Sequence, residues 1–410
     1  MRYIWIDSLC IIQDSMRDWE TESFKMGNIY ENSYVTISAT GSPDGSIHCL
    51  TDREKPVKLS LQNTTGHEME IRARKVEDHH PKMKEDEPAK LLGPLSTRAW
   101  ALQEHVLSTR ILHYTATELL FECKTSFRCE CSPSRKLLAT TPSLIPKATA
   151  KMNKHPEVIW DAWHRVVEQY SRRNLTIRND KLPAISGIAS KIQEATKSSY
   201  ITGLWEDNLA FDLLWSTSTT SMPDAHYFSL DTFRAPTFSW ASLDTPVAYP
   251  SPDEDERQVV VPSITLVSSS VSIAGLNPLG ALSAASILVL GPTLPALLLS
   301  IQKEGMWEYV LLIKGTSSIT IQHDCLLKDD VVASASSHTE QTVRRARCGD
   351  VPQAFKAPVL CLGVMRYDTW MTGLVLGLAN HTPSCWNRLG TFSAGTDVFQ
   401  YAKEKEVEIV

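Results

Sequence analysis

The sequence predicts an α+β protein of three folded parts and one linker. An α/β domain occupies residues 1–131, because its opening reads as strand, helix and strand. Residues 132–156 are rich in Ser, Thr, Pro and Lys and read as a linker. A helical connector follows over residues 157–250, where apolar residues recur at helical spacing. Residues 258–410 form an antiparallel β module, because short apolar or alternating runs are separated by turn residues.

The α/β domain opens with the length of one βαβ unit, which favours a parallel sheet. Arg2–Asp7 reads as a buried strand, Asp14 or Ser15 can cap a helix that runs to about Tyr30, and Tyr34–Ala39 is a second strand. A strand as apolar as Arg2–Asp7 usually lies between two other strands, and no residues for a further strand precede it in this sequence. We therefore expect an incomplete domain whose open strand edge favours association.

Two hairpins are expected in the rest of this domain. Lys58–Asn63 with His67–Lys75 predicts the first, and Glu77–Lys90 is a charged run that reads as a solvated loop. Arg110–Tyr114 and Glu118–Glu122 predict the second, around a Thr-Ala-Thr turn.

A short helix with candidate chemistry precedes the second hairpin. Ser96 or Thr97 can cap it, and Trp100 and Glu104 lie four residues apart on one face. A glutamate partly desolvated by an aromatic ring has a raised pKa and can exchange a proton. The simpler reading, which the residues alone favour, is a carboxylate that stabilises the helix dipole.

Two further groups of residues are candidates for a site. Asp7 and Ser8 follow the first expected strand, where ligands of open α/β sheets collect, whereas Cys10 lies in an apolar run and reads as a buried thiol.

Cys123, Cys129 and Cys131, with His113 upstream, are soft ligands for zinc, but five residues and then one separate the cysteines, which is not a standard zinc spacing. We predict no metal site.

The second half of the chain is read from its periodicity. Helices are expected over Glu157–Ser171, Leu182–Thr196 and Leu204–Trp215, and Phe233–Asp244 is expected to lie extended across a core. Strands follow from about Gln258.

Composition excludes several classes of protein. The net charge is −6 and there is no long basic stripe, so nucleic-acid binding is not expected. The longest apolar stretch, Ile287–Ile301, contains two prolines and is too short to span a membrane. Nine cysteines without a signal peptide indicate free thiols and a cytoplasmic location.

Several long stretches resemble one family. RYIWIDSLCIIQD, DWETESFKMGNIYENSYVTISA and LSTRAWALQEHVLSTRILHYTATELLFEC resemble the HET domain of filamentous fungi, the heterokaryon-incompatibility domain. YSRRNLTIRNDKLPAISGIASKI and FRAPTFSWASLD resemble the region that commonly follows it. The resemblance covers residues 2–131 and 160–245.

The resemblance implies a role in non-self recognition between fungal individuals, in which incompatible fusion triggers programmed cell death. It implies protein partners, including self-association through the HET domain, and no cofactor. The fold of the family has been likened to the TIR domain, so the α/β part is expected to be an incomplete TIR-like domain.

TIR domains are signalling adaptors or enzymes that cleave NAD with a glutamate. Their pattern S-x-x-W-C-x-x-E is similar to Thr97-x-x-Trp100-Ala101-x-x-Glu104. By this analogy Glu104 is the expected catalytic residue, Trp100 shapes the pocket, and Asp7 and Ser8 lie at the nucleotide cleft.

The chain departs from the family at its start. HET domains usually begin earlier, with a segment near L-S-Y-x-W-G, and this sequence starts without it. We therefore expect an N-terminally truncated domain that does not cleave NAD as it stands, and that signals through protein contacts. NAD cleavage and a degenerate, inactive copy remain the alternatives.

Overall fold

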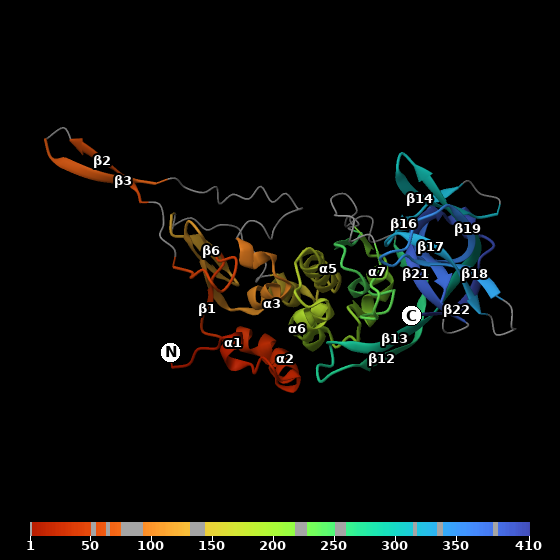
Figure 1. The fold of residues 1–410 in the computed structure, drawn as a ribbon, viewed down its shortest axis with the longest axis horizontal. Coiled ribbons are helices and arrows are strands. Elements are labelled where there is room, and N and C mark those ends of the chain that lie inside the picture. Colours follow the sequence, from red (N-terminus) through yellow and green to blue (C-terminus); the bar gives the residue numbers. More distant parts are fainter. Residues whose placement is uncertain are drawn as a thin grey trace. The chain divides into compact units, whose positions relative to one another are not determined.

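The computed structural model is a mixed α+β fold with several sheets (Figure 1). It describes residues 2–50, 55–62, 66–74, 93–131, 144–217, 228–250, 260–314, 318–333, 339–379 and 384–410. The chain divides into two compact units. The larger unit comprises Met1–Thr21, His164–Arg172 and Ile177–Val410, and the smaller unit comprises Glu22–Trp163 and Arg173–Thr176.

A four-stranded sheet with the order β1-β4-β5-β6 organises the smaller unit. β1 is parallel to β4, and the other neighbours are antiparallel. The strands are Thr36–Ser38, Arg110–Tyr114, Leu119–Cys123 and Ser126–Cys129. The second predicted hairpin is thus confirmed as β4 and β5.

The predicted N-terminal strand is wrong. Arg2–Ile6 makes no strand pairing within the described residues, and Tyr3 and Ile4 are 92% and 77% exposed. The chain then turns into a short helix, α1 (Asp7–Cys10). An apolar strand forms only where a neighbouring strand satisfies its peptide groups, and no described strand pairs with Arg2–Ile6. The expected strand–helix–strand unit is therefore reduced to the parallel pair of β1 and β4.

The first long helix is confirmed as α2 (Met16–Asn32). The predicted cap of α3 (Ala99–Leu107) by Ser96 or Thr97 is wrong, because both lie in a 3-10 turn, η1 (Pro94–Thr97). The carbonyl of Asn174 instead accepts a hydrogen bond from the Ala99 N–H at 2.9 Å. A backbone neighbour distant in sequence thus satisfies the first turn of α3.

The first predicted hairpin is confirmed as β2 (Val57–Gln62) and β3 (Glu68–Ala73), an antiparallel pair. The charged run Glu77–Lys90 lies outside the described residues, as does the first part of the predicted linker. The rest of that linker is not structureless, because Leu144–Lys151 forms α4 with Ile145 and Ala148 buried.

The connector contains two of the three predicted helices. α5 (Glu157–Ser171) is confirmed, and α6 (Ser186–Thr196) follows two 3-10 turns, Arg178–Lys181 and Pro183–Ile185. The third predicted helix is wrong, because Leu204–Trp215 divides into shorter elements. They are β8 (Leu204–Trp205), η5 (Glu206–Asn208) and α7 (Leu209–Asp212). The connector also contains β7 (Tyr200–Ile201), β9 (Ser216–Thr217), η7 (Trp240–Ser242) and β10 (Val247–Ala248).

The C-terminal part contains a ten-stranded sheet, mostly antiparallel, with a short parallel pairing of β21 and β22. Its strands and the separate hairpin of β17 and β18 are β11 (Val261–Pro262), β12 (Thr265–Ile273), β13 (Leu282–Lys303), β14 (Met306–Leu312), β15 (Ile319–Thr320), β16 (Gln322–His323), β17 (Leu327–Ala333), β18 (Thr339–Arg345), β19 (Phe355–Arg366), β20 (Trp370–Leu378), β21 (Cys385–Gly395) and β22 (Lys403–Ile409). A last 3-10 turn, η8 (Thr396–Phe399), precedes β22.

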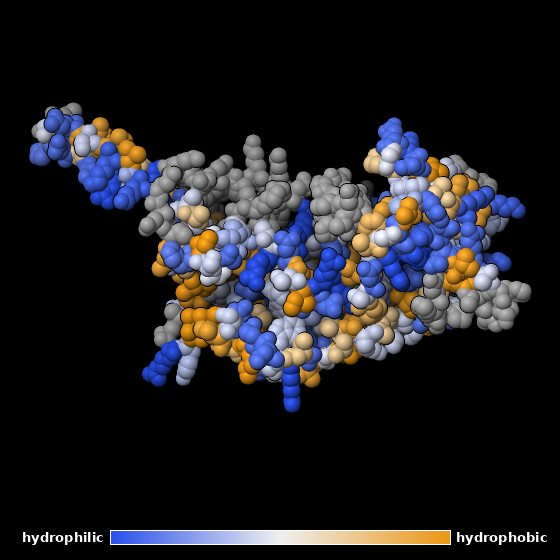
Figure 2. Space-filling view, viewed as in Figure 1, coloured by the Kyte–Doolittle hydropathy of each residue, from blue (hydrophilic) through white to orange (hydrophobic). Residues whose placement is uncertain are grey.

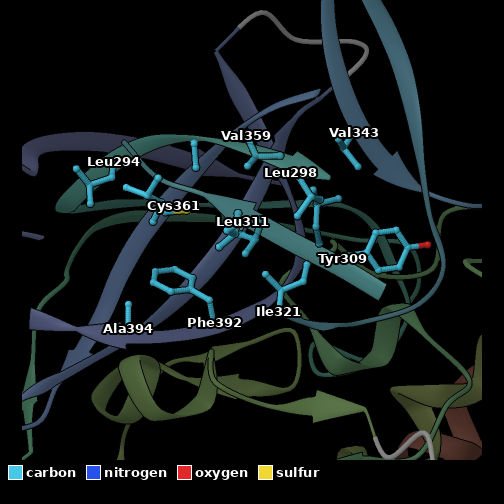
Figure 3. Packing of buried hydrophobic residues seen from close by; sticks show 14 of the residues in the cluster. Leu294, Leu298, Tyr309, Leu311, Ile321, Val343, Val359, Cys361, Phe392 and Ala394 are labelled. Atoms are coloured by element: carbon cyan, nitrogen blue, oxygen red, sulfur yellow. The ribbon is translucent and has the colours of Figure 1, made fainter. Parts of the chain in front are cut away.

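β13 closes five strands of this sheet into a ring. Its first half, Ile287–Thr293, pairs with β22, and its second half, Thr293–Ser300, pairs with β19. β20 and β21 complete the ring. The core of the sheet is apolar, with Leu298, Leu311 and Cys361 among its buried side chains (Figure 3). Among the described residues, no helix combines the length and apolar character needed to cross a bilayer.

Candidate functional site

The two catalytic candidates lie on α3, as their spacing predicts. Trp100 and Glu104 are both half-buried, so each retains contact with solvent. The peptide oxygen of Glu104 accepts hydrogen bonds from the backbone and the hydroxyl of Ser108, at 3.2 and 2.7 Å, which end the helix. α3 is anchored by Leu102 and Val106, which are 0% and 2% exposed.

The two candidates for the nucleotide cleft lie on α1. Asp7 and Ser8 are exposed, and the Asp7 Oδ1 atom accepts the backbone N–H of Ser8 at 2.7 Å. They belong to the larger unit, whereas Trp100 and Glu104 belong to the smaller one. Each pair is therefore described by itself. The neighbouring Cys10 was expected to be a buried thiol, but it is exposed.

The structure assembles a buried polar cluster that the sequence reading missed. Nε2 of His105 lies 2.7 Å from Oε2 of Glu122, and Nε2 of His113 lies 3.0 Å from the same oxygen. The exposure of Glu122 is 0% and that of His113 is 3%, while the His105 side chain keeps 13%. The two imidazole rings meet edge to face at 5.3 Å.

Three elements bring these residues together. β4 and β5 pair so that Ile111 faces Glu122 and His113 faces Leu120. Side chains alternate along a strand, so all four lie on one face, which is buried. His105 comes from the last turn of α3. The sequence signal was one polar residue on the buried face of each strand, His113 on β4 and Glu122 on β5, where an apolar residue is expected.

The electrostatics of the cluster follow from its burial. Burial by itself would raise the pKa of Glu122, but the charge of His105 and the hydrogen bonds with both imidazoles lower this pKa to about 2. Burial lowers the pKa of His113 despite its contact with Glu122. Glu122 is therefore a carboxylate, and His113 is held towards its neutral form.

The remaining polar atoms of the cluster differ in their hydrogen bonding. Nδ1 of His113 lies 3.1 Å from Oγ1 of Thr40, a residue that is 1% exposed. The second carboxylate oxygen of Glu122, Oε1, is buried without a hydrogen-bond partner among the residues described. A buried carboxylate oxygen without a donor is costly, and such groups in native proteins usually have a partner.

The structure separates the cysteines and histidine considered together in the sequence. The Cys129 thiol donates to Oε2 of Glu118 at 2.6 Å, and burial raises its pKa. Cys131 is nearby, and the ligand atoms of Glu118, Cys129 and Cys131 all lie within 4.8 Å of one another. Cys123 instead contacts Thr125. All nine cysteines are free.

A second buried His–carboxylate contact lies in the larger unit. Nε2 of His164 is 2.6 Å from Oδ1 of Asp212, and Oδ2 of Asp212 accepts the Trp205 N–H at 2.6 Å. The His164 ring stacks on Tyr249 at 3.8 Å. These polar contacts join neighbouring elements of the connector. We therefore assign His164 and Asp212 a structural role, in which they hold α5 against α7.

Comparison with known proteins identifies the first quarter of the chain. Residues 1–104 match the family described as Heterokaryon incompatibility protein (HET). No curated protein and no solved structure matches the chain. The match ends at Glu104, so it includes Asp7, Ser8 and Trp100 and stops one residue before His105. Over residues 1–104, the first quarter of the chain, this protein is therefore similar to the HET family of heterokaryon incompatibility proteins.

Proposed function

We propose that the chain is a fungal heterokaryon-incompatibility protein that takes part in non-self recognition and signals cell death through protein–protein contacts. The match of residues 1–104 to the HET family carries this proposal. In the same proposal the HET domain is TIR-like, acts in the cytoplasm, and associates with a second copy of itself.

An exposed apolar face within the matched residues supports a role in protein contact. Along β2 and β3, five apolar side chains are 43–64% exposed: Val57, Leu59, Leu61, Met69 and Ile71. Leu59 faces Ile71 and Leu61 faces Met69 across the hairpin, so the apolar residues share one face. Figure 2 shows orange spheres along one side of this hairpin and blue spheres along the other.

The opposite face of the hairpin is polar and internally balanced. Glu70 pairs with Lys58 at 3.3 Å and with Arg72 at 2.9 Å, so these charges largely satisfy one another. A lone two-stranded hairpin is marginal in water, and its apolar face gains stability when another surface covers it. Two copies that bury the same face against each other form a self-complementary contact with two-fold symmetry.

Adjacent positions on β2 provide a matched test. Leu59→Lys and Ser60→Lys introduce the same charge one residue apart, on opposite faces of the strand, and Ser60 lies opposite Glu70, so a lysine there is tolerated. We expect Leu59→Lys to abolish self-association in light scattering and to suppress the cell-death response on hyphal fusion. Ser60→Lys should leave both intact. Equal behaviour of the two variants would show that the apolar face is not the contact.

NAD cleavage is the second candidate function, because Trp100 and Glu104 are half-buried and therefore reachable from solvent. The assay is NAD consumption by the purified chain, with Glu104→Gln as the test variant and Glu130→Gln, on an exposed glutamate of the same unit, as the control. We expect no consumption by the native chain. If the native chain consumes NAD and only Glu104→Gln abolishes this activity, the proposal of signalling by protein contact is wrong and enzymatic signalling takes its place.

A further inference from the structure

The buried cluster of His105, His113 and Glu122 has the composition of a metal site. The ligand atoms of these three residues all lie within 4.8 Å of one another. Two imidazoles and one carboxylate are a common ligand set for Zn²⁺ and other first-row divalent ions. We propose that this cluster binds one Zn²⁺ ion, a role that goes beyond the proposed function.

The geometry is close to what zinc needs. Zinc–nitrogen and zinc–oxygen bonds of about 2 Å in a tetrahedron leave neighbouring ligand atoms roughly 3.3 Å apart. The two Nε2 atoms lie 2.7 and 3.0 Å from Oε2 of Glu122. The three side chains therefore need to open by only a few tenths of an ångström to admit the ion.

The unpartnered oxygen of Glu122 is an independent indication of a ligand. Oε1 is fully buried without a hydrogen-bond partner among the described residues, on a side chain that is 0% exposed. An ion that binds both oxygens of Glu122 as one bidentate ligand, together with the two imidazoles, satisfies this atom and leaves the fourth tetrahedral position open.

Thr40 contacts the ring nitrogen of His113 that does not face Glu122. Its hydroxyl lies 3.1 Å from Nδ1 of His113. When Nε2 of His113 binds the ion, its proton is on Nδ1 and donates to Thr40 Oγ1, the outer-shell contact that fixes a metal-bound imidazole. Oγ of Ser38 lies 2.8 Å from the same hydroxyl and fixes its position in turn.

The ion would join α3 to the sheet. His105 comes from the last turn of α3, and His113 and Glu122 come from β4 and β5. His105 keeps 13% of its side chain exposed, which gives the ion a path of entry on that side.

The competing set in the same unit is Glu118, Cys129 and Cys131. Its central thiol already donates to Glu118 Oε2 at 2.6 Å, and it would have to give up that proton before it could bind zinc. In the histidine cluster, His105 and His113 must each release the Nε2 proton that faces Glu122, and a change of tautomer frees Nε2 of either imidazole without loss of a thiol proton.

The test is calorimetric titration of the purified full chain with Zn²⁺, with Co²⁺ absorption as a spectroscopic measure of coordination. We expect one Zn²⁺ per chain, and a loss of at least 100-fold in affinity in Glu122→Gln and in His105→Ala. Thr40→Val should weaken binding about tenfold. Cys131→Ser, and His155→Ala at a histidine that is 63% exposed, should bind as the native chain does.

Circular dichroism without metal checks that each variant folds. Should Glu122→Gln fail to fold, His105→Ala decides, because His105 is the least buried of the three residues. Absence of Zn²⁺ binding by the native chain overturns the proposal. So does unchanged binding in His105→Ala, or a loss of binding confined to Cys131→Ser, which would assign the ion to the cysteine set.

Discussion

A buried ion network in the larger unit gives a sharp prediction about stability. The Arg388 guanidinium binds both carboxylate oxygens of Asp324 at 2.9 Å, and Arg345 contacts the same carboxylate. Arg388 is 0% exposed and Asp324 is 2% exposed. Arg388 also donates to the carbonyls of Leu213 and Trp215, and its guanidinium lies 3.6 Å from the Trp215 ring centre. Asp324 therefore neutralises the cation that joins the connector to β21.

Asp324→Asn keeps the shape of the side chain but removes its charge. The asparagine retains one acceptor oxygen, and its NH₂ group faces guanidinium donors where Asp324 accepted hydrogen bonds. Hydrogen bonds to charged groups contribute about 1.5–3 kcal/mol each, and the loss of one partner from a buried pair costs about 3–5 kcal/mol. We expect Asp324→Asn to lower the free energy of unfolding by about 4 kcal/mol.

Urea unfolding followed by tryptophan fluorescence measures this loss, since Trp215 lies against Arg388. Glu70→Gln is the control: Glu70 also pairs with two cations, but its side chain is 45% exposed, so the midpoint should not move. In the double variant Asp324→Asn/Arg388→Met the loss should be smaller than the sum of the single losses. A loss below about 1 kcal/mol in Asp324→Asn would refute the argument, because an uncompensated buried charge costs more.

Two further predictions concern buried positions elsewhere in the larger unit. Lys181 is 4% exposed and donates to the Leu243 carbonyl at 2.8 Å, and burial lowers its pKa from 10.5 to about 7. Between pH 7 and 10.5 the unfolded chain therefore binds more protons than the folded chain. The free energy of unfolding should rise with pH across this window, by at most about 1.4 kcal/mol per pH unit. Urea titrations at several pH values should show this rise in the native chain and not in Lys181→Met. At Gly373, a Cβ atom would lie 2.1 Å from the Leu362 carbonyl oxygen, so Gly373→Ala should lower the thermal midpoint, whereas Gly45→Ala, with no atom within 4 Å, should leave it unchanged.

Local patterns were sufficient to predict several elements. Helix α2 and the hairpin of β4 and β5 depend on spacing and turn residues that lie within a short window of sequence. The strand expected at Arg2–Asp7 depends on a neighbouring strand, and no local pattern contains that information. The third connector helix failed for a related reason: Asp212 accepts the Trp205 N–H, a contact that holds Trp205 in β8 rather than in a helix.

Short-range sequence patterns also could not predict the ring of strands. The apolar run Ile287–Ile301 contains Pro292 and Pro295, which disfavour a central strand, yet it lies within the 22-residue strand β13. β13 changes partner near Thr293, from β22 to β19, and only the register of three distant segments specifies this exchange. The buried cluster of His105, His113 and Glu122 has the same character, because its members come from three elements. Its trace in the sequence is the pair of polar residues at buried strand positions.

Glu104 and His105 are neighbours on α3, and this makes the two site hypotheses separable. Successive residues on a helix point about 100° apart, so His105 contacts Glu122 while Glu104 is oriented differently. An ion bound by His105 would fix the end of α3 that carries Glu104, whereas the Glu104 carboxylate contributes no ligand atom. His105→Ala should therefore lower zinc affinity and also any NAD consumption that depends on Glu104. Glu104→Gln should abolish such consumption and leave zinc affinity unchanged. Zinc binding that required Glu104 would contradict the geometry on which the metal site rests.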